Sequence, residues 1–214
     1  VNIDHVATIR NARGSSHPDP LSIANHVMKC GAHSITIHLR EDRRHIKDLD
    51  VINICKNKKL ITNLEISLNE KIINIALKNK PNYISIATEQ RKEITKDIKI
   101  KIKQKLNKIK KIIKKFKKKK IRTSLFVDPN LKDIKIAKEL DVDCVELHTG
   151  KISNLIKRKK DYLQEYKKIK KCCKAAKKIG LEVHAGHGLD YKSTSILSKL
   201  KEIEEFNIGP VSYT

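Results

Sequence analysis

Short apolar segments with the alternation of β-strands recur along almost the whole of this 214-residue chain, and amphipathic helical segments separate them. Strand patterns occur at Val1–Asp4, Ser34–His38, Ile61–Ile66, Tyr83–Ile86, Thr123–Val127, Cys144–His148, Leu181–His184 and Phe206–Ile208. Helical patterns occur at Pro20–Cys30, Asp48–Lys58, Asn69–Lys78, Ile98–Lys119 and Leu131–Leu140, in a long helix ending near Ile179, and at Ser193–Leu200. Regular alternation predicts a parallel sheet, and this number of units predicts an α/β fold, a (β/α)8 TIM barrel that lacks its final helix.

A doubly wound open sheet is the alternative arrangement, but no glycine-rich dinucleotide fingerprint follows the first strand. The 7 glycines and 5 prolines fall singly between the periodic segments, so nothing resembles a linker between domains. We therefore expect one barrel domain over residues 1–209. No apolar run approaches the roughly 18 residues of a membrane span. The 5 cysteines include no Cys-x-x-Cys pair, which favours reduced thiols in a cytoplasmic protein.

The formal net charge of +24 raises the question of a nucleic-acid partner. Much of the charge lies in one segment, where 14 lysines fall between Lys96 and Lys120. Apolar residues recur there at helical spacing, so the lysines cover the rest of an amphipathic helix. Aromatic residues make up 4% of the chain, which leaves few stacking platforms for bases. We favour a solvated lysine face over a polyanion-binding surface.

Polar side chains share one face of four predicted strands, whereas buried parallel strands are usually apolar on both faces. The pairs are Asn2 with Asp4, Thr36 with His38, Asn63 with Glu65, and Glu146 with His148. Each pair lies at or near the carboxyl end of its strand, where barrel enzymes place their active sites. Burying these groups together without a substrate or an ion would be costly. The pattern therefore indicates an active site rather than four independent buried polar groups.

The loops after the strands add arginines, histidines and glycines. Segment 4–14 contributes two arginines, and Arg40, Arg43, Arg44 and His45 follow the second predicted strand. Ala-Gly-His-Gly at 185–188 allows close approach of backbone N–H groups to a ligand. Arginine binds phosphate and carboxylate well, so the loops favour an anionic substrate, although we expect Arg43 or Arg44 to pair with Glu41 or Asp42.

Histidines beside carboxylates are suited to general acid–base catalysis near neutral pH. A metal centre is the competing interpretation, with four histidines as candidate ligands: His38, His148, His184 and His187. The sequence lacks a helical His-Glu-x-x-His motif, which weakens this alternative. No cysteine or serine lies in a recognisable nucleophile elbow, so covalent catalysis is weaker still.

Several motifs, in order along the chain, resemble the pyridoxine 5′-phosphate synthase family. They are VNIDHVATIRNARG at 1–14, HLREDRRHI at 38–46, NLE at 63–65, ELHTG at 146–150, AGHGL at 185–189 and NIG at 207–209. The resemblance implies a (β/α)8 barrel enzyme of vitamin B6 biosynthesis with no metal or other cofactor. It implies condensation of 3-amino-2-oxopropyl phosphate with 1-deoxy-D-xylulose 5-phosphate, giving pyridoxine 5′-phosphate, phosphate and water. A homo-oligomer, an octamer in the family, is implied as well.

The resemblance also implies roles for individual residues. His38 and Glu65 would be general bases, His187 the general acid, and Glu146 a stabiliser of the transition state. The aminoketone phosphate would be held by Asn2, Arg13, Gly188 and Gly209 and by the position of Pro210, where the family has histidine. The deoxyxylulose phosphate would be held by Asp4, His5, Arg40, His45 and Thr95.

The chain departs from the family pattern at two places. Lys96 and Asp97 stand where the family usually has a glycine pair after the position of Thr95. After Gly209 the family continues with histidine, an apolar strand end and a helix, whereas residues 210–214 read Pro-Val-Ser-Tyr-Thr. We therefore expect a truncated barrel with a non-native tail. Two other functions stay open: a different metal-free barrel enzyme acting on phosphorylated sugars, and a basic nucleic-acid-binding protein.

Overall fold

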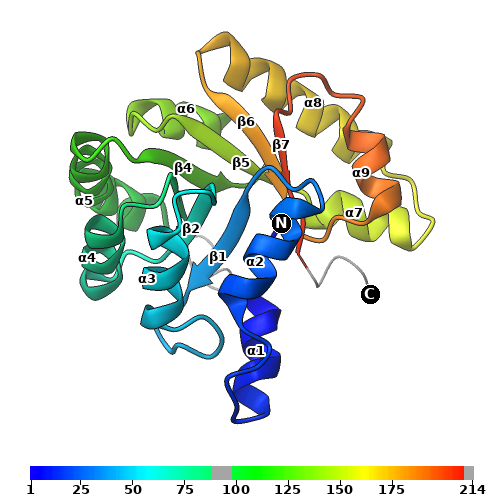
Figure 1. The fold of residues 1–214 in the computed structure, drawn as a ribbon. Helices are drawn as coiled ribbons and strands as arrows, with labels where there is room; N and C mark the ends of the chain where they lie inside the picture. Colours follow the sequence, from blue (N-terminus) through cyan, green and yellow to red (C-terminus); the bar gives the residue numbers. More distant parts are fainter. Residues whose placement is uncertain (88–97, 210–214) are drawn as a thin grey trace. The chain divides into compact units, whose positions relative to one another are not determined.

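The computed structural model describes residues 1–87 and 98–209, and its helices and strands are labelled in Figure 1. The chain divides into two compact units. The N-terminal unit comprises Ile3–Thr123, and the C-terminal unit comprises Val1–Asn2 with Ser124–Thr214. Parallel strands alternate with helices in both, so the predicted α/β fold of TIM-barrel type is confirmed for this part of the chain. No described helix follows the last strand, in line with the predicted lack of a final helix.

The N-terminal unit contains three paired parallel strands, β1 (Ile35–Leu39), β2 (Thr62–Ile66) and β3 (Tyr83–Ile86), and strand β4 (Arg122–Val127) begins in it. Its helices are α1 (Asp4–Ala12), α2 (Pro20–Lys29), α3 (Asp48–Lys56), α4 (Glu70–Asn79) and α5 (Ile98–Lys118). Side-chain caps start two of them, because Asp19 accepts from Ser22 N–H at 2.9 Å and Asn69 accepts from Lys71 N–H at 2.9 Å.

The core of the N-terminal unit lies between the strands and helices α2, α3 and α4 (Figure 1). The apolar face of β1 is fully buried through Ile35, Ile37 and Leu39, and Leu64 continues this layer on β2. Burying one such side chain contributes about 1.5–3 kcal/mol before the entropy cost of folding. Because successive side chains of a strand point to opposite faces, the other face of these isoleucine-rich strands is left for polar side chains.

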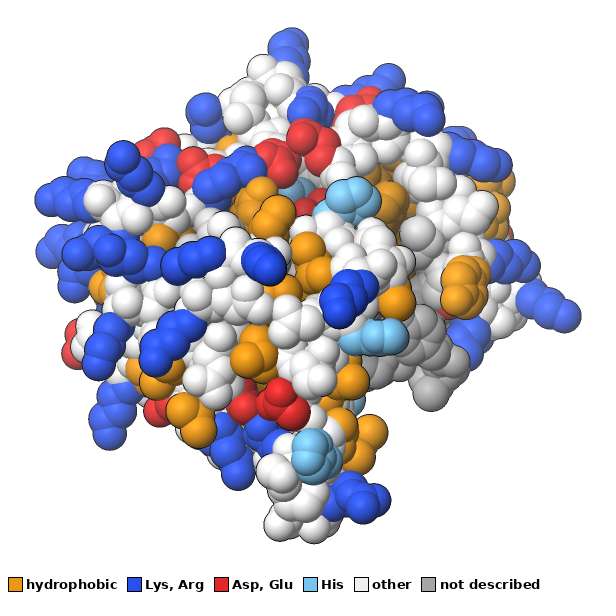
Figure 2. Space-filling model, viewed as in Figure 1, with side chains coloured by type: hydrophobic (Ala, Val, Ile, Leu, Met, Phe, Trp, Pro, Cys, Tyr) orange, Lys and Arg blue, Asp and Glu red, His pale blue; other side chains and the backbone are white. Residues whose placement is uncertain are grey.

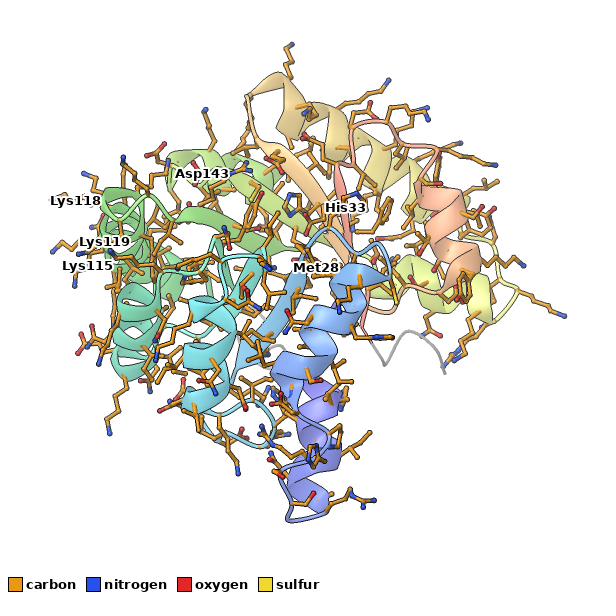
Figure 3. All side chains as sticks on the ribbon, in the orientation of Figure 1. Met28, His33, Lys115, Lys118, Lys119 and Asp143 are labelled. Carbon is orange, nitrogen blue, oxygen red and sulfur yellow. The ribbon has the colours of Figure 1, made fainter. Side chains whose placement is uncertain are left out.

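Helix α5 is amphipathic, as predicted. Ile112, Ile113 and Phe116 are buried against the rest of the N-terminal unit. Exposed lysines cover the outer surface of its described side chains: Lys108, Lys110, Lys111, Lys114, Lys115 and Lys118. Figure 3 shows Lys115 and Lys118 pointing away from the ribbon, and Figure 2 shows Lys and Arg side chains gathered over α4 and α5. Residues 98–127 contain no Asp or Glu, so the lysines that are three and four residues apart on this helix repel one another.

Replacing Lys111 by Glu is therefore expected to stabilise the protein. The new carboxylate would lie four residues before Lys115 and three after Lys108, converting repulsive pairs into attractive ones. Each such pair contributes about 0.2–0.5 kcal/mol, so the free energy of unfolding should rise by roughly 0.5–1 kcal/mol. Urea denaturation at low salt measures this gain, and 1 M NaCl should remove most of it. A loss of stability at low salt would contradict the repulsion.

The C-terminal unit contains most of β4, followed by β5 (Cys144–His148), β6 (Glu182–Gly186) and β7 (Glu205–Asn207), all parallel. Its helices are α6 (Leu131–Glu139), α7 (Gly150–Lys157), α8 (Leu163–Lys178) and α9 (Tyr191–Leu197). Val145, Leu147 and Val183 are completely buried within this unit. Asn130 and Asp190 cap α6 and α9, accepting from Asp133 N–H at 2.9 Å and Ser193 N–H at 2.7 Å.

Two sequence-based expectations about the elements are wrong. Val1–Asp4 is not a strand, because Asn2 forms an isolated bridge and helix α1 already begins at Asp4. Asn2 and Asp4 therefore do not share a strand face. The long helix ending near Ile179 is two helices, separated where Lys159 takes a positive φ of 53°. Asp161 then accepts from Leu163 N–H at 2.9 Å and starts α8. Within the described residues no helix has the length and apolarity needed to cross a membrane.

Candidate active site

His38 and Glu65 lie side by side at the carboxyl ends of β1 and β2. The strands pair in parallel with these two residues in register, and His38 Nδ1 is 3.6 Å from Glu65 Oε2. One step earlier in the register, Asn63 donates to the Thr36 hydroxyl at 3.4 Å. The polar face predicted from period-two alternation is thus confirmed on these two strands. An imidazole beside a carboxylate is an arrangement suited to proton transfer.

Asp4 and His45 extend this cluster. Asp4 Oδ1 accepts from the backbone N–H of His38 at 2.7 Å and lies 3.9 Å from His45 Nδ1. The His38 and His45 rings are 5.9 Å apart between centroids. His5, on the first turn of α1, is exposed, and its ring is 6.5 Å from that of His45. The N-terminal unit therefore brings together five of the predicted site residues, Asp4, His5, His38, His45 and Glu65.

The loop after β1 contains three arginines, two of which share Asp42 as a partner. Arg44 Nε donates to Asp42 at 2.8 Å, as predicted for one of the two arginines, whereas Arg43 Nε pairs with Asp48 at 2.6 Å. Arg40 Nε is 3.4 Å from Asp42. Arg43 also donates to the Arg40 carbonyl at 2.6 Å and so folds the loop back on itself. Arg40 is half-buried beside the histidine cluster, which is suitable for an anion-binding side chain.

Burial lowers the pKa of both histidines in this cluster. The pKa of His38 falls from 6.5 to about 4 because of burial first, and then because of the charges of His45 and Arg40. The pKa of His45 also falls to about 4 because of burial first and then Arg40. Both imidazoles are therefore neutral at pH 7, so the His38 ring keeps one unprotonated nitrogen that is able to accept a proton.

These shifts predict that stability falls as the pH is lowered from about 6.5 to about 4. In this range His38 and His45 bind protons in the unfolded chain but stay neutral in the folded protein. The free energy of unfolding therefore falls by up to about 1.4 kcal/mol per pH unit for each histidine. Urea unfolding at pH 7.5, 6 and 5 measures the slope. His45→Gln should reduce it, whereas His33→Gln should not, because His33 is an exposed residue before β1 (Figure 3). Equal slopes in both variants would contradict the assignment.

Asp4, His38 and His45 are also the potential metal ligands that the described residues bring together, with one ligand atom of each within 4.8 Å of the others. Two of these side chains already accept backbone hydrogen bonds, since Ile46 N–H donates to His45 Nδ1 at 2.9 Å and His38 N–H donates to Asp4. The positive charge of Arg40 opposes a cation beside both histidines. The donor set is therefore poorly suited to a resident cation.

In the C-terminal unit, Glu146 is a buried carboxylate with a fixed orientation. The amide of Asn207 on β7 donates to Glu146 Oε2 at 2.7 Å. Glu146 and Asn207 are 2% and 7% exposed. A Cβ atom built at Gly186 would lie 2.0 Å from Glu146 Oε1, so only glycine leaves room for the carboxylate at that position. The Asn207 amide therefore fixes one oxygen of the Glu146 carboxylate, and the absence of a side chain at Gly186 leaves room for the other.

His187 and His148 form the second part of this cluster. Their rings stack with centroids 4.6 Å apart, and Phe126 contacts His148 edge-on at 5.5 Å. His187 is exposed and has a positive φ of 80°, a conformation that costs energy in a residue other than glycine. Thr149 stabilises it, because the Thr149 hydroxyl donates to the carbonyl of His187 at 2.8 Å. An exposed imidazole on a strained, fixed backbone is well placed to meet a ligand.

Asn2, Gly188 and Gly209 also lie in the C-terminal unit. Asn2 N–H donates to the Ile208 carbonyl at 2.8 Å, and a Cβ atom at Gly209 would lie 3.2 Å from the Asn2 Cβ. Asn2 and Gly209 are therefore neighbours, as expected for two residues with the same predicted ligand. Gly188 has a positive φ of 72° and approaches Gly150 closely.

The remaining predicted residues differ in what the structure says of them. Arg13 is exposed at the end of α1 in the N-terminal unit. Thr95 and Pro210 lie outside the described residues. His184, one of the candidate metal ligands, is buried with Nε2 2.8 Å from Glu182 Oε1. Sequence reasoning missed Asn207 and Thr149 as contact residues, although both stand inside the recognised motifs NIG and ELHTG.

Parallel βα units whose strand ends carry histidines beside carboxylates are typical of α/β enzymes of the TIM-barrel type. The family model described as "Pyridoxal phosphate biosynthesis protein PdxJ" matches residues 1–212. The chain belongs to this family, an enzyme family of vitamin B6 biosynthesis.

Two relatives are named pyridoxine 5′-phosphate synthase. The protein of Pelagibacter ubique is 71% identical over 98% of this chain and 87% of its own length. The protein of Blochmanniella pennsylvanica is 46% identical over 98% and 85%. Among solved structures, the aldolase QR15 aligns over 99% of this chain and 88% of its own with a TM-score of 0.62 and 14% identity. D-Psicose 3-epimerase aligns over 90% of this chain and 82% of its own, with a TM-score of 0.56 and 12% identity. At these identities both structures support the fold alone.

Proposed function

We propose that this chain catalyses the condensation of 3-amino-2-oxopropyl phosphate with 1-deoxy-D-xylulose 5-phosphate to pyridoxine 5′-phosphate, phosphate and water. Family membership and the 71% identical relative named pyridoxine 5′-phosphate synthase support this assignment. The observation that carries it is the His38–Glu65 pair, matched in register on β1 and β2 with 3.6 Å between Nδ1 and Oε2. Imine formation, dehydration and ring closure each require proton transfer, which such a pair supplies.

In this proposal His38 and Glu65 act as general bases. His38 is suited to the role because the low pKa of its buried imidazole keeps it neutral at pH 7. His187 is the general acid, and its exposed ring supports a direct contact with substrate. Glu146 stabilises positive charge that develops in the transition state, since the carboxylate is buried and oriented by Asn207.

Two phosphorylated substrates require two sets of anion-binding groups. We assign the deoxyxylulose phosphate to Asp4, His5, Arg40 and His45, in and beside the N-terminal unit's histidine cluster, and to Thr95, which lies outside the described residues. The aminoketone phosphate is assigned to Asn2, Arg13, Gly188, Gly209 and the position of Pro210. The half-buried Arg40 guanidinium supports the first assignment, and the adjacency of Asn2 and Gly209 supports the second.

We further propose that residues 1–209 act as one catalytic domain in a cytoplasmic homo-oligomer, with no cofactor. Coincident unfolding transitions by fluorescence and circular dichroism test the single domain. Light scattering after gel filtration tests the oligomer, and a monomeric mass at micromolar concentration would contradict it.

Genetic complementation tests the function in a cell. A bacterium that lacks its own pyridoxine 5′-phosphate synthase needs added pyridoxine, and expression of this chain should restore growth without it. The Glu65→Gln variant, expressed to the same level, should not. If the chain is present as folded protein and growth is not restored while the Pelagibacter ubique relative restores it, the proposed function is wrong.

The basic surface of α5 is the observation that favours the alternative, a nucleic-acid-binding protein. Binding to duplex DNA tests it directly, because affinity carried by these lysines would fall steeply with salt. We expect no binding at physiological salt. Tight binding there, with a steep salt slope, would support the alternative.

A further inference from the structure

Helix α1 holds the backbone of the His45 loop through a single amide. The Asn11 side chain donates to the carbonyl of His45 at 2.9 Å and to the carbonyl of Arg44 at 3.2 Å. Asn11 is half-buried, so a water molecule does not easily replace both bonds. The position of the His45 backbone therefore depends on where α1 places this amide.

Asn11 is itself fixed by Arg10 and Asp50. Arg10 Nη2 and Nε donate to Asn11 Oδ1 at 3.1 and 3.2 Å, and Arg10 Nη2 also donates to Asp50 Oδ2 at 2.9 Å. The side chains of Arg10 and Asp50 are 12% and 9% exposed, so this fork is shielded from solvent. Asp50 Oδ2 accepts in addition from Lys47 N–H at 2.8 Å. One network thus grips the loop on both sides of His45.

The His45 ring has a defined tautomer as a result. Ile46 N–H donates to His45 Nδ1 at 2.9 Å, so Nδ1 is an acceptor and the proton of the neutral ring is on Nε2. This bond exists only while the backbone at positions 45 and 46 keeps its conformation. A neutral imidazole with Nε2–H is a hydrogen-bond donor for a phosphate oxygen.

We propose that Asn11 is a positioning residue for deoxyxylulose phosphate binding, acting through the backbone and tautomer of His45. The proposal rests on the function proposed above for His45. Arg10 and Asp50 support Asn11 and, through Lys47, the far side of the loop. None of the three needs to touch the substrate.

Two variants of Asn11 separate this role from general packing. Asn11→Asp keeps an oxygen for Arg10 but loses both N–H donors, whereas Asn11→Ala loses both functions. Asn25→Ala is the matched control, because Asn25 is also half-buried on a helix and also both donates and accepts, to Leu21 and from Asn57. All three variants are expected to lose some stability.

The readouts are the Kd of 1-deoxy-D-xylulose 5-phosphate by calorimetry, steady-state kinetics, and the ¹⁵N spectrum of the His45 ring at pH 7. Both Asn11 variants should raise this Kd about tenfold, as expected for the loss of two hydrogen bonds. They should leave kcat within about threefold and KM for the aminoketone phosphate unchanged. The ring spectrum should change from a single Nε2–H tautomer to a mixture.

The proposal is overturned if Asn11→Asp and Asn11→Ala keep the wild-type Kd and ring spectrum. It is also overturned if Asn25→Ala raises the Kd as much as they do, because the effect would then be general. If wild-type protein neither binds nor converts the substrates, the proposed function fails. The ring spectrum still tests whether Asn11 positions His45, so the two failures are distinguishable.

Discussion

Replacing Glu65 by Gln is expected to lower kcat by about 10³-fold, within the 10²–10⁴-fold range of general acid–base catalysis. The amide has the size of the carboxylate but removes the negative charge 3.6 Å from His38 Nδ1 and the ability to accept a proton. The side chains of His38 and Glu65 are 14% and 21% exposed, so neither is fully buried and the fold should tolerate the change. Steady-state kinetics with both phosphorylated substrates measures the loss.

Glu70→Gln is the matched control for this variant. Glu70 is an exposed glutamate in the first turn of α4, a few residues further along the chain. Its replacement should leave kcat unchanged and cost a few tenths of a kcal/mol through the helix dipole. If Glu65→Gln retains more than about a tenth of wild-type kcat, Glu65 is not a general base.

The second large effect is expected for Gly186→Ala. The added methyl group would lie 2.0 Å from Glu146 Oε1 and 3.1 Å from the Asn207 Cβ. The carboxylate must move, and its 2.7 Å bond from Asn207 is lost in a buried site. Overpacking of this kind costs about 1–3 kcal/mol, and misplacing Glu146 should lower kcat about 10²-fold or more. Urea denaturation and steady-state kinetics report the two effects.

A double-mutant cycle isolates the clash. Combining Gly186→Ala with Glu146→Ala removes the atom that the new methyl group meets, so the two losses of stability should be less than additive. Gly14→Ala shows the effect of backbone strain without a clash, because Gly14 has a positive φ of 60°, which Gly186 lacks, and no atom lies within 4 Å of its added Cβ. It should cost about 1 kcal/mol and leave kcat unchanged. Additive losses in the cycle would contradict the steric argument.

The site on β1 and β2 was predictable because a strand has period two and parallel neighbours stay in register. Thr36 and His38 on one strand, and Asn63 and Glu65 on the next, appear in the sequence as polar residues alternating with isoleucine and leucine. The pairing of His38 with Glu65 then follows from the register alone. The loop ion pairs were less predictable, because Arg43 reaches forward to Asp48 rather than to its immediate neighbours.

The features that sequence reasoning placed wrongly or missed have separate local causes. Residues 1–4 alternate like a strand, but four residues are too few to exclude a helix start at Asp4. The break between α7 and α8 contains no glycine or proline. Lys159 takes the positive φ there, which a residue with a side chain rarely does, so the residue types do not predict the break. Asn207 was missed because β7 has three residues, too short to show a face.

The central claim is tested most directly by the condensation reaction itself. The chain, and the same chain extended with the C-terminal segment of the Pelagibacter ubique relative, of which it covers 87%, are each incubated with 3-amino-2-oxopropyl phosphate and 1-deoxy-D-xylulose 5-phosphate. Mass spectrometry should detect pyridoxine 5′-phosphate, with one phosphate released per molecule formed, and the Glu65→Gln variants should form about 10³-fold less. Absence of the product from both folded wild-type chains, under conditions in which the relative forms it, would contradict the account.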